Sequence, residues 1–465
     1  MMKSRQLRIC VALSACSLCS GAMAGSWEMF PTVQSGVSYN DNPALEPESQ
    51  IRGQDRATTY LFGLAEADFV KAEPSYTVTV SPRVRHLEYP DSDFEQLSRT
   101  DYYLRGDATK VAPLHSLSLS ASYDRLNVLS AEDYSPGDDI GGGGSDFENL
   151  DDIRERYRIS PSFNWSLTQK DSVSAAASFT ITDHKLEDTA RPRADIDSLS
   201  WSLQYLRSIT PRQSLGFFLS GADSDSERPG ATGTCADGFD LVPDFTMDVF
   251  CPDVPAGLTP EEYAVIRAIY PYGVADAEFL TESETTTYNL SWRYQWSENT
   301  RLDLNFGQQD TTSKSTTVAF GGPAFTQDLG FDGRNYSLNL TNAGQRYRFE
   351  LSASRGVTTQ TDGTPSDNIE LGGFFVYRLA PKLSIRVEGS GSERTSSSTF
   401  RDTTILFYRV DTSLGWRLSE KLTVSGVYIY RKRDPEEVLV TGEVNRVNNS
   451  IRKSNAFVGT ITYRF

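Results

Sequence analysis

The last residues of the chain alternate between two kinds of side chain and end on an aromatic ring. One set consists of Phe457, Gly459, Ile461, Tyr463 and Phe465, and the other of Val458, Thr460, Thr462 and Arg464. A repeat of two is typical of a β-strand with unlike faces. A strand that continues to the final residue needs a partner along its full length. The first strand of a closed barrel supplies that partner and leaves no sheet edge.

The same alternation recurs through most of the sequence. Clear examples are 157–165, 288–296 and 422–428, where aliphatic and aromatic residues alternate with Ser, Thr, Asn, Gln or Arg. We count about eighteen such segments of roughly ten residues, the length of a tilted transmembrane strand. The sequence therefore predicts an all-β protein.

The connections between these segments alternate in length. Short ones occur at 71–75, 167–171, 296–300, 379–382 and 418–421, and long ones at 40–56, 128–152, 221–282, 312–333 and 431–449. This alternation predicts a closed antiparallel transmembrane β-barrel of about 18 strands with short periplasmic turns and long extracellular loops. Both termini would then be periplasmic.

The N-terminal residues indicate export. Lys3, Arg5 and Arg8 precede an apolar run at 9–15, and a small-x-small cleavage site ends at Ala24. A lipoprotein-type site at Cys16 is the alternative. We therefore expect a signal peptide at 1–24 and an outer-membrane barrel at 25–465.

The chain ending resembles the C-terminal signature of bacterial outer-membrane β-barrels, which also finish on an aromatic residue after alternating apolar positions. The resemblance implies that the barrel assembly machinery reads Tyr463 and Phe465 as an assembly signal. It also implies a location in the bacterial cell outer membrane, with lipid and lipopolysaccharide as partners.

The charge excludes one class of partner. The net charge is −17, and the signal carries three basic residues and no acids, so the exported chain carries −17 − 3 = −20. Nucleic acid needs a positive surface, and we therefore expect no nucleic-acid binding.

Two cysteines remain after the signal peptide, Cys235 and Cys251. Both belong to one polar loop of an exported protein, so we predict a disulfide between them. No Cys/His cluster predicts a metal site, and we expect no cofactor. His86, His115 and His184 belong to no catalytic motif, although His86 with a serine is a pairing that outer-membrane phospholipases use. We expect no catalytic residues and no enzyme.

If the apolar set faces lipid, the polar set lines the lumen, and it is rich in arginine. Carboxylates share this face, among them Asp101, Asp303 and Glu350. One interpretation is a ladder of arginine–carboxylate pairs that balances charge in a wet barrel. The other is a positive wall that favours anionic or sugar-like cargo. The candidate lumen-lining residues are Arg83, Arg85, Arg105, Arg154, Arg156, Arg158, Arg293, Arg301, Arg346, Arg348, Arg386, Arg409 and Arg417.

Residues 33–45 end their strand on the sequence Tyr39-Asn40-Asp41-Asn42. This Tyr-x-Asp-Asn exit resembles the first strand of a beta-barrel porin family that is associated with exopolysaccharide biosynthesis and export systems. The resemblance implies passive passage of surface polysaccharide through a polar lumen, with polysaccharide export components as partners. A general diffusion porin and a structural or adhesive surface barrel without transport remain the alternatives.

Overall fold

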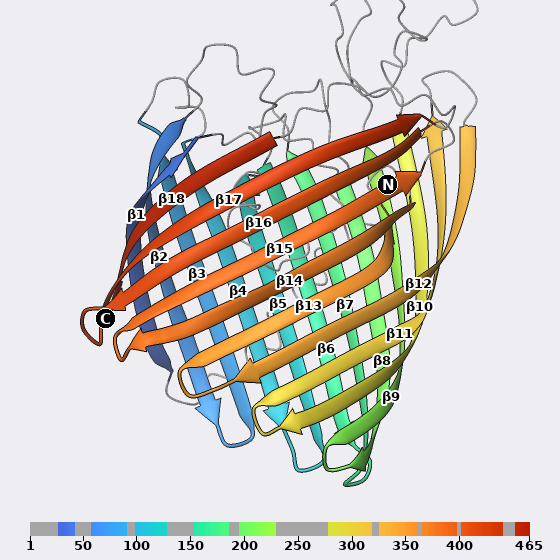
Figure 1. Cartoon of the computed structure of the whole chain (residues 1–465), viewed down its shortest axis with the longest axis horizontal. Coiled ribbons are helices and arrows are strands. Elements are labelled where there is room, and N and C mark those ends of the chain that lie inside the picture. Colours follow the sequence, from blue (N-terminus) through green and yellow to red (C-terminus); the bar gives the residue numbers. More distant parts are fainter. Residues whose placement is uncertain are drawn as a thin grey trace, which may run out of the picture.

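The computed structural model describes residues 27–41, 57–90, 98–127, 153–185, 195–228, 278–318, 325–359, 365–397, 401–439 and 452–465. They form eighteen β-strands in a single sheet (Figure 1). The strands are β1 (Glu28–Asn40), β2 (Thr58–Glu73), β3 (Tyr76–Glu88), β4 (Arg99–Val111), β5 (His115–Asn127), β6 (Ile153–Ser166), β7 (Asp171–Lys185), β8 (Asp195–Thr210), β9 (Gln213–Arg228), β10 (Glu278–Ser297), β11 (Thr300–Val318), β12 (Phe325–Ala343), β13 (Tyr347–Thr359), β14 (Pro365–Ala380), β15 (Leu383–Ser397), β16 (Arg401–Arg417), β17 (Leu422–Leu439) and β18 (Arg452–Arg464).

Every strand pairs antiparallel with its neighbours in the chain, and β1 also pairs with β18. That last ladder runs from Thr32 opposite Arg464 to Asn40 opposite Ala456. The predicted closed antiparallel barrel of eighteen strands is therefore confirmed, and the C-terminal strand has the partner that its alternation requires.

The two faces of the sheet differ in chemistry. The large apolar side chains with the greatest exposure, such as Phe457, Ile461 and Phe465, share one face. The most buried side chains, such as Ser38, Asp101 and Thr311, are polar and lie on the other face. Side chains crowd together inside a closed barrel and diverge outside it. We therefore call the apolar side the outer face and the polar side the inner face.

Aromatic residues mark both ends of the apolar belt. Exposed tyrosine and tryptophan residues stand eight positions apart on β6, β10 and β16, as the pairs Tyr157 and Trp165, Tyr288 and Trp296, and Tyr408 and Trp416. Eight residues extend about 26 Å along a strand, or about 20 Å along the membrane normal for a tilt near 40°. The belt approaches the roughly 25 Å apolar band of outer-membrane barrels, and the protein lies in the bacterial outer membrane. Among the described residues, no helix is long and apolar enough to cross a membrane.

Several strands are longer than the alternation predicted. The predicted loop at 221–282 is shortened because β9 continues to Arg228 and β10 begins at Glu278. The predicted loops at 312–333 and 431–449 likewise contain parts of β11, β12 and β17. Above the belt the outer face also carries polar side chains, such as Thr312 and Lys432, so the apolar–polar alternation is lost while backbone pairing continues. The signal at 1–24, Cys235 and Cys251 lie outside the described residues.

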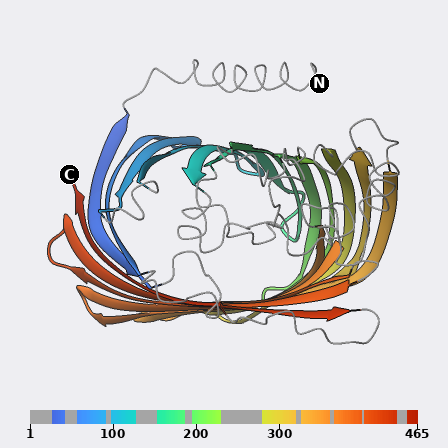
Figure 2. The same cartoon turned by 90° about the horizontal axis from the view of Figure 1, so that it is seen from above.

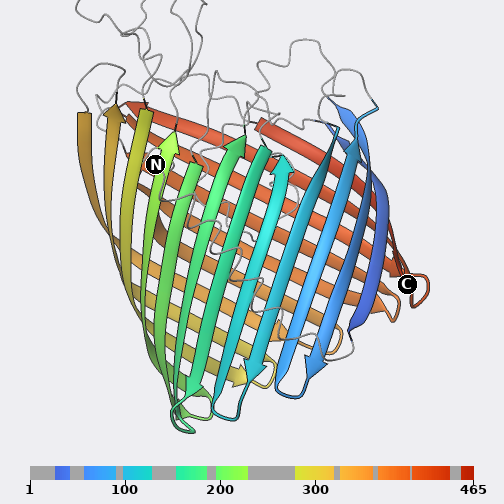
Figure 3. The same cartoon turned by 180° about the vertical axis from the view of Figure 1, so that it is seen from behind.

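The barrel is flattened in cross-section (Figure 2). The orange and red strands β13 to β18 form one broad wall, and the blue and green strands β2 to β9 form the opposite wall. The strands of the two walls cross at a steep angle (Figure 3). This flattening produces a tight corner where β12 meets β13.

Side chains fasten the seam between β1 and β18 at its extracellular end. The Asp41 carboxylate accepts hydrogen bonds from the backbone N–H of Asn455 at 2.6 Å and from its side-chain Nδ2 at 2.7 Å. The Asn40 Oδ1 accepts a bond from Ser454 Oγ at 2.7 Å. Asn40 and Asp41 of the Tyr-x-Asp-Asn sequence therefore help to close the barrel, and this role is structural.

We expect Asp41→Ala to lower the free energy of unfolding by about 1–3 kcal/mol, because it removes two charge-assisted hydrogen bonds from the closing seam. Urea unfolding in detergent, followed by the heat-modifiable gel shift of the folded barrel, measures this. Glu284→Ala, which removes an exposed carboxylate from β10, is the control and should change stability by less than about 0.5 kcal/mol. Equal effects of the two variants would refute the role of Asp41.

Candidate functional site

The structure places twelve of the thirteen predicted arginines on the inner face, where they are distributed over eight strands. Arg346 differs, because it lies in the turn between β12 and β13. The inner-face residues are Arg83 and Arg85 on β3, Arg105 on β4, Arg154, Arg156 and Arg158 on β6, Arg293 on β10, Arg301 on β11, Arg348 on β13, Arg386 on β15, and Arg409 and Arg417 on β16.

The most buried charged group on this face is centred on Asp101 of β4. Arg85, directly opposite on β3, donates to Asp101 Oδ2 from Nε at 3.0 Å and from Nη2 at 2.7 Å. Arg99 Nε lies 3.5 Å from Asp101 Oδ1. Two guanidinium groups therefore share one carboxylate in a region that is almost closed to solvent.

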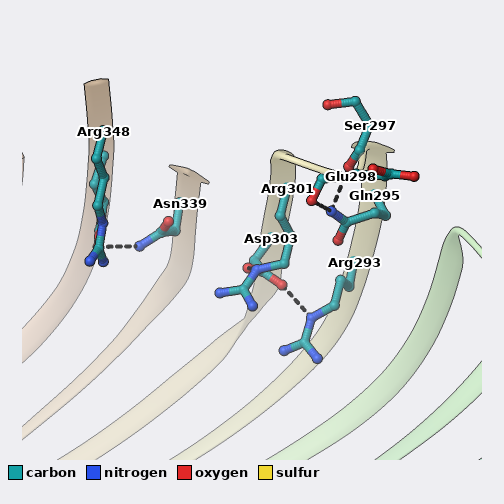
Figure 4. Close-up of polar contacts among 9 residues, drawn as sticks. Arg293, Gln295, Ser297, Glu298, Arg301, Asp303, Asn339 and Arg348 are labelled. Atoms are coloured by element: carbon teal, nitrogen blue, oxygen red, sulfur yellow. Dashed lines mark hydrogen bonds and ion pairs between the residues drawn. The ribbon is translucent and has the colours of Figure 1, made fainter. Parts of the chain in front are cut away.

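The same arrangement occurs at two other places. Asp124 of β5 contacts Arg154 at 3.2 Å and Arg156 at 2.9 Å. Asp303 of β11 contacts Arg293 at 2.6 Å and Arg301 at 2.7 Å, and the three side chains lie together near the periplasmic end (Figure 4).

These groups bear on the two interpretations of the arginines. Single pairs do occur, at Arg105–Asp107, Arg348–Glu350, Arg386–Glu388 and Arg409–Asp411. Asp101, Asp124 and Asp303 nevertheless each contact two arginines. In the Asp303 group, two guanidinium groups meet one carboxylate. The inner face thus combines charge balance at some rungs with local positive potential near the periplasmic end.

The positively charged side chains of the inner face are all of one type. Within the described strands, the inner face carries arginine and no lysine; the lysines at 71, 110, 185, 314, 432 and 453 occupy outer-face registers. Guanidinium keeps its charge and binds carboxylate or phosphate through two parallel hydrogen bonds. This distribution suits recognition of oxyanions.

Sequence reasoning missed several inner-face arginines. Arg99, Arg394, Arg431 and Arg433 also occupy inner registers, and Arg431 and Arg433 are buried. Arg431 and Arg433 fell in the predicted loop at 431–449. The alternation of Arg431, Lys432 and Arg433 carries no apolar signal, so only the pairing with β16 reveals their face.

A different surface covers the inner face from β4 to β10. Small hydroxyl side chains line a cavity of about 560 Å³ there, including Ser118, Ser160, Ser178, Ser202 and Thr287. Ser160 and Ser178 lie 2.9 Å apart, Oγ to Oγ, and are within hydrogen-bond distance. We call this surface the hydroxyl wall. It offers many neutral donors and acceptors and few bulky side chains.

The three histidines are separated on the barrel. His86 lies on the outer face with its Nδ1 3.0 Å from Thr100 Oγ1, His115 lies beside the ring of Phe163, and His184 is on β7. The hydroxyl beside His86 therefore belongs to a threonine at an exposed position. Among the described residues no group of His, Cys, Asp and Glu is arranged to hold a metal ion.

No protein-family profile matches the sequence, and no curated protein sequence matches it. Solved structures with a similar architecture include the FrpB iron transporter from Neisseria meningitidis (10% identity, 95% of this chain and 82% of that chain, TM-score 0.47). Others are the ferric-catecholate import receptor Fiu from E. coli (9%, 93% and 81%, 0.45) and the siderophore receptor PiuA from Acinetobacter baumannii (10%, 94% and 82%, 0.43). The function proposed below depends on the inner face of this chain and not on these similarities.

Proposed function

We propose that the barrel is an outer-membrane channel that passes anionic and sugar-like solutes passively along its inner face. The observation that carries the proposal is the charge pattern of the inner face: Asp303 contacts both Arg293 and Arg301, and the described strands carry arginine and no lysine on their inner registers. Charged rings and patches of this kind set the selectivity of water-filled pores. A barrel of eighteen strands is wide enough for an aqueous pathway.

The hydroxyl wall supports the finer part of the proposal, that the cargo is an acidic surface polysaccharide. Sugar hydroxyls can exchange hydrogen bonds with serine and threonine along β4 to β10, while carboxylate groups on the polymer contact the arginines. The resemblance of the first strand to the exopolysaccharide-associated porins points to the same cargo and to export components as partners. A general diffusion porin would share the channel but would not distinguish acidic from neutral saccharides.

We expect the purified protein to conduct ions in planar bilayers with a preference for anions. Replacing Arg154, Arg156 and Arg158 together by glutamine should lower the anion-to-cation permeability ratio about fivefold, equivalent to about 1 kcal/mol. Reversal potentials in a KCl gradient measure the ratio. The difference should shrink in 1 M salt, where the Debye length is about 3 Å.

A control removes two arginine charges from the outer face. Arg125→Gln combined with Arg207→Gln should leave the permeability ratio unchanged, because both positions lie outside the lumen by strand register. A wild type without conductance would refute the channel and favour a structural or adhesive barrel. Conductance that acidic and neutral oligosaccharides of equal length block at the same concentration would favour a general porin.

A further inference from the structure

The hydrogen-bonded ladder between β12 and β13 stops partway up the wall. It runs from Ala343 opposite Arg348 to Tyr336 opposite Arg355, although β12 extends to Phe325 and β13 to Thr359. Over 325–335, β12 keeps its ladder with β11, and no rung to a described residue of β13 continues. Above Tyr336, one side of β12 thus pairs with no described residue of β13.

Above that point β13 passes over the inner face of β12 instead of lying beside it. A Cβ added to Gly333 of β12 would lie 2.7 Å from Val357 Cγ2, so only glycine allows this approach. Val357 belongs to the outer face of β13 and is buried, unlike most apolar side chains of that face. β11 also contacts β13, and β12 contacts β14, in each case across one intervening strand.

One side chain replaces the missing rungs. Val357 N–H donates to Gln309 Oε1 at 3.0 Å, and Gln309 Nε2 donates to the carbonyl oxygen of Val357. Gln309 belongs to β11, so its amide reaches across Gly333 to occupy the place of a neighbouring peptide group. Gln309 is itself buried.

On the outer side of the corner, an ion pair joins β13 to β14, the strand on the side away from β12. Arg355 of β13 donates to Asp367 of β14 from Nε at 3.0 Å and from Nη2 at 2.6 Å. Tyr336, opposite Arg355 at the last rung, belongs to the upper edge of the apolar belt, with Leu338 below it. The ladder therefore ends at the level where acyl chains give way to polar lipid headgroups.

We propose that the β12–β13 junction is a lateral portal, latched by Gln309, through which the inner face opens to the headgroup layer of the outer leaflet. Its ligand is an amphiphile whose polar head enters the barrel beside Asn335 and Ser337 while its acyl chains stay against Leu338 and Leu351. Each backbone hydrogen bond of a ladder adds to the free energy needed to separate two strands. Strands joined at a corner by a side-chain amide therefore separate at a lower free-energy cost than strands joined by a continuous ladder.

Spin labels on either side of the junction test the latch. The labels are placed by Asp332→Cys on β12 and Glu393→Cys on β15, with Cys235 and Cys251 replaced by serine. Double electron–electron resonance in nanodiscs should show a longer and broader distance distribution after Gln309→Leu. The control Asn305→Leu removes an amide from the same strand that bonds Ser337 Oγ at 2.8 Å, where the ladder is intact, and should leave the distribution unchanged.

A second experiment tests the portal by measuring whether lipid headgroups reach the inner face. A fluorophore attached through Ser337→Cys reports from the inner face, and lipids with a nitroxide on the headgroup are the quencher. Quenching should increase after Gln309→Leu and return to the wild-type value when Asn335→Cys and Gly356→Cys form a disulfide; a Cβ at Gly356 would lie 3.7 Å from Asn335 Nδ2.

Two results would overturn the proposal. Unchanged distances after Gln309→Leu would mean that the corner is a fixed overlap. Longer distances without added quenching would mean that the wall separates but admits no lipid head. If Gln309→Leu does not fold, Gln309→Asn, which is one methylene shorter and cannot hold both groups of Val357, gives the same comparison. Neither result depends on ion conductance, so the channel proposed above stands or fails separately.

Discussion

Replacing Asp101 by leucine should lower the free energy of unfolding by about 3–5 kcal/mol, the largest stability effect that we expect of any single substitution in the barrel. The carboxylate is 1% exposed and lies within 3.5 Å of two guanidinium groups. Its removal leaves two positive charges close together in a region that excludes most water. Breaking a buried ion pair from one side typically has a cost of this size.

An exposed pair on the same strand supplies the control for Asp101. Asp107 contacts Arg105 at 2.7 Å, and the side chains are 67% exposed for Arg105 and 37% for Asp107. Asp107→Leu should therefore cost less than about 1 kcal/mol. Urea unfolding in detergent micelles compares the two variants. Similar losses for Asp101→Leu and Asp107→Leu would show that water screens both sites equally.

Deleting Phe465 should reduce the folded barrel in the outer membrane several-fold while leaving the stability of assembled molecules almost unchanged. Its ring is 66% exposed on the outer face and stacks edge-on to Tyr463 with 4.9 Å between centroids. Only its backbone N–H, which donates to the Pro31 carbonyl at 3.2 Å, contributes to the seam. We expect the side chain to act as the signal that the assembly machinery reads.

The heat-modifiable fraction in isolated outer membranes measures this effect. Phe465→Trp should restore the wild-type amount, because it keeps an exposed aromatic residue at the terminus. Refolding from urea into detergent should proceed equally for the wild type and the deletion, since no assembly machinery is present. A normal amount of folded barrel after deletion would remove the proposed role of the terminal ring.

The strand count and the barrel could be predicted because each strand carries the signal within its own residues. The alternation in 157–165 or 288–296 needs no knowledge of the neighbouring strand. The upper parts of β9, β11 and β17 could not be predicted, because polar side chains occupy both faces there and remove the contrast that alternation depends on. The β12–β13 corner depends on Gln309 and Val357, which are far apart in the sequence, and no local pattern connects them.

The face of most arginines could be predicted, but their grouping could not. Arg154 and Arg156 stand two positions apart on β6, so the alternation of a strand places them on the same face. Their common partner Asp124 follows only from the register between β5 and β6. The Tyr-x-Asp-Asn exit was interpreted through a family resemblance, and the structure shows that Asn40 and Asp41 close the seam. The motif therefore marks the end of the first strand and fastens that strand to β18.

The separation of arginine from lysine makes the pathway inert toward one class of reagent. Acylating reagents that consume primary amines would alter only the outer face and the turns, where Lys170, Lys382 and Lys421 lie, while the guanidinium groups of the interior kept their charge. A cell could thus have the surface of this barrel covalently modified, by its own enzymes or by its surroundings, without any change in what the interior attracts.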